Sequence, residues 1–119
     1  WILCEEQDRA QEAVALADRG LEINRDYVDL VDTRGVAYYR LGRYDKAVED
    51  LARCVEMYPA GNPAGAGSRF HLARAYAKLK RSADAIRLLK EALDLHKRIG
   101  GLTAADVAEA EKLLADLQP

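Results

Sequence analysis

Apolar and small residues recur every three or four positions through most of the chain. They do so between residues 28 and 40, and again from Tyr44 onward. The first set is Val28, Val31, Gly35, Tyr38 and Tyr39, and the second is Ala47, Val48, Leu51, Cys54 and Val55. This period is typical of amphipathic α-helices. Because Gly42 can adopt the left-handed conformation that ends a helix, the pattern predicts a helical hairpin that closes before Pro59.

Gly35 lies inside the first of these predicted helices. Glycine costs about 1 kcal/mol relative to alanine in a helix interior, so its presence calls for a packing reason. Small side chains at Gly35, Ala47 and Cys54 predict helix axes only about 8–10 Å apart. Tyr38 and Leu51 are expected to fill the space between the helices.

The same residue arrangement occurs twice. Residues 28–61 contain Gly35, Tyr38, Ala47, Leu51, Cys54 and Pro59, and residues 66–97 contain Leu72, Ala73, Tyr76, Ala85, Leu89 and Ala92. This arrangement resembles the tetratricopeptide repeat over about residues 10–97. The resemblance implies an all-α fold of antiparallel helix-turn-helix repeats that stack as a right-handed superhelix.

The second copy is displaced by 38 residues, as from Tyr38 to Tyr76, whereas the usual period of the family is about 34. The extra residues lie within residues 58–67, which are rich in proline and glycine. We therefore expect a longer surface connection there, with repeats at 28–61 and 66–99 on either side of it.

The two ends of the pattern differ. Residues 12–21 look like the second helix of an earlier repeat, and only Trp1 to about Glu6 precede it, so residues 1–25 are interpreted as a partial first repeat with an exposed apolar edge. At the other end, a helix from about Ser82 is expected to extend to Ile99. A capping box at Thr103 and Asp106 then predicts a last helix over 103–117, with Val107, Ala110, Leu113, Leu114 and Leu117 on one stripe. We interpret it as a capping helix that completes a single domain over 1–119.

Composition and charge argue against several classes of function. The net charge of −2 gives no general attraction to nucleic acid, and no apolar run approaches the ~20 residues that span a bilayer. Charge is uneven, with sums of −5 over residues 1–60, +6 over 69–98 and −3 over 99–119. Cys4 and Cys54 lack the spacing of a metal or redox motif, so we expect buried free thiols, no cofactor or metal, and a cytoplasmic location.

No constellation of catalytic residues is evident. His71 and His96 lack a convincing nucleophilic partner, and the glycines of residues 61–67 lack the lysine of a phosphate-binding loop. Asp29 and Asp32 share a helix face, which is ordinary surface chemistry. The chain is therefore not expected to be an enzyme.

The resemblance also implies where a partner would bind, because the first helix of each hairpin lines the concave surface in this family. The matching positions here are Asp29, Asp32, Val36, Tyr39, Arg40, Phe70, His71, Arg74 and Lys78. Tyr39 and Phe70 are candidates to hold an apolar side chain, and the basic residues to hold carboxylates. The carboxylate clamp of chaperone-binding members is absent, since its positions hold Thr33, Gly67 and His71.

The sequence thus predicts a protein-interaction module or scaffold whose groove holds a peptide or protein partner. Two alternatives stay open. One is a structural role, in which the N-terminal edge stacks on another copy or on further repeats. The other is an accessory domain of a larger enzyme or regulator, with the groove packed against a neighbouring domain.

Overall fold

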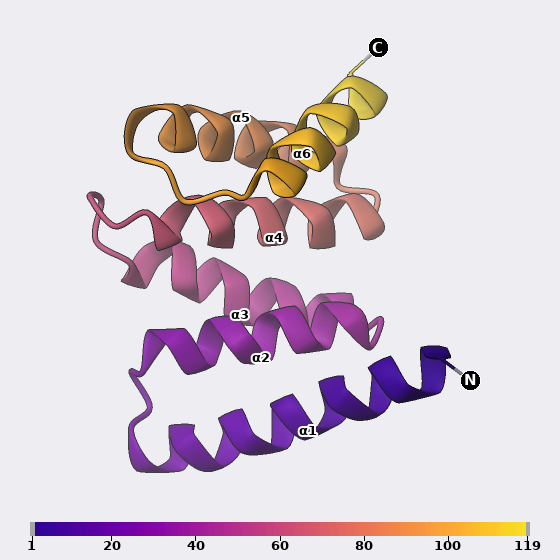
Figure 1. Ribbon diagram of the computed structural model, residues 1–119, viewed down its shortest axis with the longest axis vertical. Coiled ribbons are helices and arrows are strands. Elements are labelled where there is room, and N and C mark those ends of the chain that lie inside the picture. The colour runs from indigo at the N-terminus through magenta and orange to yellow at the C-terminus, as the bar shows by residue number, and fades with distance from the viewer. Residues whose placement is uncertain (1, 119) are drawn as a thin grey trace.

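Six helices make up the computed structural model, which describes the backbone of residues 2–118 and the side chains of residues 5–118 (Figure 1). The helices are α1 (Ile2–Ile23), α2 (Val28–Arg40), α3 (Tyr44–Met57), α4 (Ala64–Lys78), α5 (Ser82–Ile99) and α6 (Ala104–Leu117). Each of the first five packs against the next in chain order, and α6 packs obliquely on α5 (Figure 1). The all-helical repeat architecture is confirmed, whereas the handedness of the superhelix stays a prediction.

The core is continuous through the second half of the stack. The main cluster of buried residues joins α3, α4, α5 and α6, with Leu51, Phe70 and Leu89 fully buried. A smaller cluster, made of Leu21, Val31, Cys54 and Tyr58, joins α1 to α2 and α3. Burial therefore follows the apolar faces that the sequence pattern defines.

Close packing at Gly35 brings α2 and α3 together. An ideal Cβ at this position would lie 2.8 Å from Leu51 Cγ and 3.1 Å from Asp50 Cβ, closer than van der Waals contact allows. Leu51 is itself fully buried and occupies the space that the missing side chain leaves. The expected reason for a glycine in this helix is confirmed.

Arg34, next to this contact, joins three helices. Its Nε and Nη2 donate to Asp50 of α3 at 2.8 Å each, and its Nη1 donates to Asp18 of α1 at 2.9 Å. Asp50 is buried, so the bidentate pair supplies the hydrogen bonds that this carboxylate lost from water. These ion pairs thus connect α1, α2 and α3.

Both hairpin turns close in the same way. Gly42 has φ +76°, and the Arg43 N–H donates to the Tyr38 carbonyl. In the second hairpin Lys80 takes the equivalent place with φ +64°, and the Arg81 N–H donates to the Tyr76 carbonyl. The left-handed conformation is therefore required by the turn, even where the residue is not glycine.

The connection between the repeats is shorter than expected, because residues 64–67 belong to α4. The Asn62 side chain accepts from the Ala64 N–H at 2.9 Å and so starts the helix directly after Pro63. Gly65 and Ala66 are buried. The small residues at 64–67, which were predicted to form a loop, thus form the first turn of α4 and pack closely against its neighbours.

At the N-terminus, α1 begins at Ile2, so residues 2–11 continue the helix predicted for 12–21 instead of forming the remnant of a partner helix. The expected exposed apolar edge is present, because 64% of Leu16 and 90% of Ile23 is exposed. The side chain of Cys4 lies outside the described residues. The division of the chain at residue 25 stays a prediction.

The C-terminal end is as expected. α5 extends to Ile99, and the capping box of α6 is formed by Thr103 and Asp106. Ala110 is fully buried, and the leucines of the stripe pack against the main core. Within the described helices, none has the length and apolar content to cross a membrane.

Replacing Gly35 by alanine should lower the free energy of unfolding by about 1–2 kcal/mol, because overpacking against Leu51 outweighs alanine's better helix propensity. Gly67→Ala is the matched control. Its Cβ would meet only the Gly101 carbonyl oxygen at 3.9 Å, so this variant should gain up to about 1 kcal/mol. Urea unfolding followed by circular dichroism measures both, and equal shifts would contradict the close contact.

Exchanging the residues at the two hairpin turns should have opposite effects. Lys80→Gly relieves a left-handed lysine and should raise stability by up to about 1 kcal/mol, whereas Gly42→Lys should lower it by a similar amount. Thermal unfolding of the two variants tests this expectation. A stabilised Gly42→Lys variant would show that the turn does not need positive φ.

Candidate functional site

A groove of about 250 Å³ lies between α2 and α6, with α4 as its floor. Three residues predicted for the concave surface, Tyr39, Arg74 and Lys78, meet in it. The groove is also lined by Ala77 of α4 and by Glu109, Lys112, Leu113 and Asp116 of α6. We call these eight residues the α2–α6 groove.

Arg74 is the most constrained residue of the groove. Its guanidinium carbon lies 4.5 Å from the centre of the Tyr39 ring and 5.3 Å from that of Phe70. Its Nε is 3.5 Å from Glu109 Oε1, which makes an ion pair between α4 and α6. Cation–π contacts at these distances are attractive and restrict the movement of the guanidinium.

His71 lies one residue beyond Phe70, partly buried. Burial lowers its pKa to about 4, the charge of Arg74 lowers it further, Asp106 opposes the shift, and Arg40 adds the smallest lowering. The imidazole is therefore neutral at neutral pH. A neutral ring suits this position, because a third positive charge beside two arginines would be repelled.

Asp29 and Asp32 lie away from the α2–α6 groove, in the first turns of α2. Tyr58 donates its hydroxyl to Asp29 Oδ1 at 2.8 Å, and the buried Ser68 donates to Asp32 Oδ1 at 3.4 Å. Burial raises the pKa of Asp32, an effect that the bond from Ser68 opposes and the charge of Asp29 reinforces. These carboxylates join α2 to α3 and α4, so their observed contacts are structural.

Phe70 cannot anchor a partner side chain, because it is fully buried. It is the largest side chain of the main core, and its ring contacts the Arg74 guanidinium. Val36 packs against the same core and is only partly exposed. The family resemblance implied that both line the concave surface, but neighbouring residues cover α4 at Phe70.

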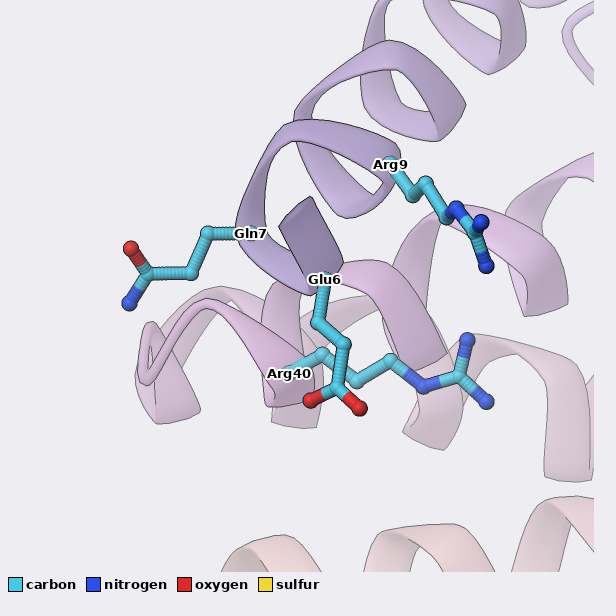
Figure 2. Close-up of a pocket in the computed structure, with 4 residues that line it drawn as sticks. All are labelled: Glu6, Gln7, Arg9 and Arg40. Carbon is cyan, nitrogen blue, oxygen red and sulfur yellow. The ribbon is translucent and has the colours of Figure 1, made fainter. Parts of the chain in front are cut away.

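Arg40 lines a different hollow. This space of about 410 Å³ lies between α1 and the end of α2, and its other lining residues are Glu6, Gln7 and Arg9. Figure 2 shows Glu6 and Arg40 extending into the same region while Gln7 points away. Of the nine predicted residues, the α2–α6 groove therefore contains three.

The α6 residues of the groove were missed at the sequence level. Glu109, Lys112 and Asp116 recur three to four positions apart, which places them on one face of the helix. The sequence therefore could have shown that these three residues share one face of the helix. It did not show which side of α6 faces α4, because the angle between the helices is set by the loop and by packing.

The groove offers chemistry for recognition. It combines an aromatic ring, aliphatic surface and charges of both signs, a composition typical of protein contact sites. Within residues 5–118, no cluster of three or more His, Cys, Asp or Glu side chains has the arrangement of a metal site. The thiol of Cys54 is buried, and burial is the main reason that its pKa rises to about 12, so it is a poor nucleophile.

Acidification should destabilise the protein through His71. Since its folded pKa lies below the ordinary value of 6.5, the unfolded chain binds more protons between about pH 6.5 and 4. The free energy of unfolding should fall through this window by up to about 3 kcal/mol and be unaffected above it. Urea unfolding of the unmodified protein and of His71→Gln, compared across pH, isolates this effect from the carboxylates. Parallel curves would contradict it.

Comparison with known proteins agrees with the fold and the repeat pattern. The family model described as tetratricopeptide repeat matches residues 27–98, more than half of the chain. No curated protein matches the chain. The matched segment begins just before α2 and ends in the last turn of α5, and so contains both complete hairpins. The chain belongs to the tetratricopeptide repeat family, whose repeats serve as protein-interaction modules.

Proposed function

We propose that this protein binds a segment of a partner protein in the α2–α6 groove. The observation that supports the proposal most directly is the convergence of Tyr39, Arg74 and Lys78 from two hairpins, with α6 completing the wall. Tyr39 offers an apolar ring, and Lys78 is exposed at the rim. Because packed helices hold these side chains before binding, little conformational entropy is lost on association.

The proposed role is recognition without catalysis, so no residue is assigned to a chemical step. A reducing compartment such as the cytoplasm suits the free, buried thiol of Cys54. Nucleic acid is not proposed as a ligand, because two carboxylates, Glu109 and Asp116, line the groove and would repel phosphate groups.

A second candidate function is self-association through α1. It is favoured by the exposure of Leu16 and Ile23, large apolar side chains that lie seven residues apart on the same helix. Sedimentation of the unmodified protein and of Leu16→Glu/Ile23→Glu separates this role from groove binding. A mass that rises with concentration only in the unmodified protein would support it.

Affinity capture tests the groove. The unmodified protein should retain a partner from a lysate of the source organism that Tyr39→Ala/Lys78→Glu does not retain. With the purified partner, the double variant should bind at least about tenfold more weakly. Arg74 is left unchanged, because it packs on Phe70 and its loss would disturb the core.

Lys90→Glu is the control for charge, because Lys90 is an exposed lysine of α5 outside the groove. It should capture and bind the partner as the unmodified protein does. Circular dichroism must first show that all variants keep their helix content. Equal binding by the double variant and the control would overturn the proposal.

A further inference from the structure

We infer that the α2–α6 groove recognises a carboxylate of an acidic partner segment through Arg74, and that Glu109 of α6 competes with this carboxylate from within the chain. The inference rests on the proposed binding function of the groove and adds the chemistry of the partner. It also gives α6 a role beyond covering the end of the core.

The first argument is the unsatisfied state of Arg74. Its Nε is buried and has no hydrogen-bond acceptor within the described residues. The Glu109 carboxylate is near enough for an ion pair, at 3.5 Å, but it does not complete that hydrogen bond. The contact with Glu109 is therefore a weak one. The two Nη groups of Arg74 also form no hydrogen bond within the described residues and are not buried, so a carboxylate that enters the groove can bind them.

Preorganisation is the second argument. The Arg74 guanidinium carbon lies 4.5 Å and 5.3 Å from the centres of the Tyr39 and Phe70 rings, which restrict its movement, and about a quarter of the side chain stays exposed. A planar guanidinium held in this way is suited to bidentate contact with a carboxylate. Arg34, by contrast, is committed to Asp50 by two hydrogen bonds of 2.8 Å.

The third argument is the surrounding charge. Lys78 and Lys112 flank Arg74 in the groove, and neither forms an ion pair with any residue in the described part of the chain. Against these three cations the groove holds two carboxylates, Glu109 and Asp116. An acidic segment is thus complementary to the groove, whereas a basic one would meet uncompensated positive charge.

The chain itself provides an example of such a segment. α6 carries four acidic residues and one basic residue, and it presents Asp106 toward His71 and Glu109 toward Arg74. It is connected through Gly100 and Gly101, with φ of +84° and +115°, while the buried Leu102 fixes the start of the helix. α6, which packs on α5, therefore already places acidic side chains beside residues of α4, and Glu109 reduces the affinity of Arg74 for a second carboxylate.

The test uses the full chain and three fluorescein-labelled peptides of one Leu/Ala framework, with Glu, Gln or Lys at the same positions. Fluorescence anisotropy should show that the Glu peptide binds and that added salt weakens it. Glu109→Gln should strengthen its binding by about threefold to tenfold, because Arg74 is released. Glu111→Gln is the matched control, since this exposed carboxylate of α6 lies outside the groove, and it should have no effect.

Three results would overturn the inference. These are equal affinity for the Gln and Glu peptides, equal effects of Glu109→Gln and Glu111→Gln, and no binding of the Glu peptide to either protein. The inference and the proposed function can fail separately. If a captured partner depends on Lys78 but is indifferent to Glu109→Gln, the groove still binds a partner, and only the carboxylate competition is refuted.

Discussion

The close approach of paired helices is the constraint on which the rest of this structure depends. Gly35 leaves room for the fully buried Leu51, and the second hairpin repeats the arrangement with Ala73 and Leu89, both fully buried. Because protein interiors are close-packed, one added carbon at Gly35 would clash with Leu51, and the surrounding core leaves no space into which this leucine could move. The hairpin geometry set by these contacts fixes how successive helices stack, and hence where the side chains of α2 and α4 meet.

Polar contacts act on this scaffold where helices of different hairpins meet. Arg34 connects α1, α2 and α3, and Tyr58 and Ser68 hold the carboxylates at the start of α2. Each of these buried or partly buried groups finds a hydrogen-bond partner, as stability requires. Arg74 is different, because its Nε lacks one among the described residues. Arg74 also lines the groove, which is why a binding role is proposed for it.

The groove also shows how a helix at the end of a repeat array can serve two purposes. α6 and the loop before it bury Ala110 and Leu102 in the core, and the side of α6 next to the apolar stripe contributes charged residues to the groove wall. The apolar stripe supplies the packing energy, so the charged side is free to vary without loss of the fold. Binding specificity is therefore proposed to reside partly in a helix outside the matched repeats, which end at residue 98.

Sequence alone determined the elements that rest on local chemistry. The periodic apolar faces, the turn at Gly42 and the capping box at Thr103 each depend on residues close in the chain, so the helices and the repeat family could be predicted. It could not place Ala64–Gly67, because small residues are helical only where neighbours close around them. The sequence also could not show that Asp29 and Arg40 lie outside the groove that contains Tyr39, or that Phe70 is buried. Residues on one helix face meet different neighbours along the length of the helix. The angle at which α6 packs on α5 was decided by tertiary packing, and that angle brought Glu109 to Arg74.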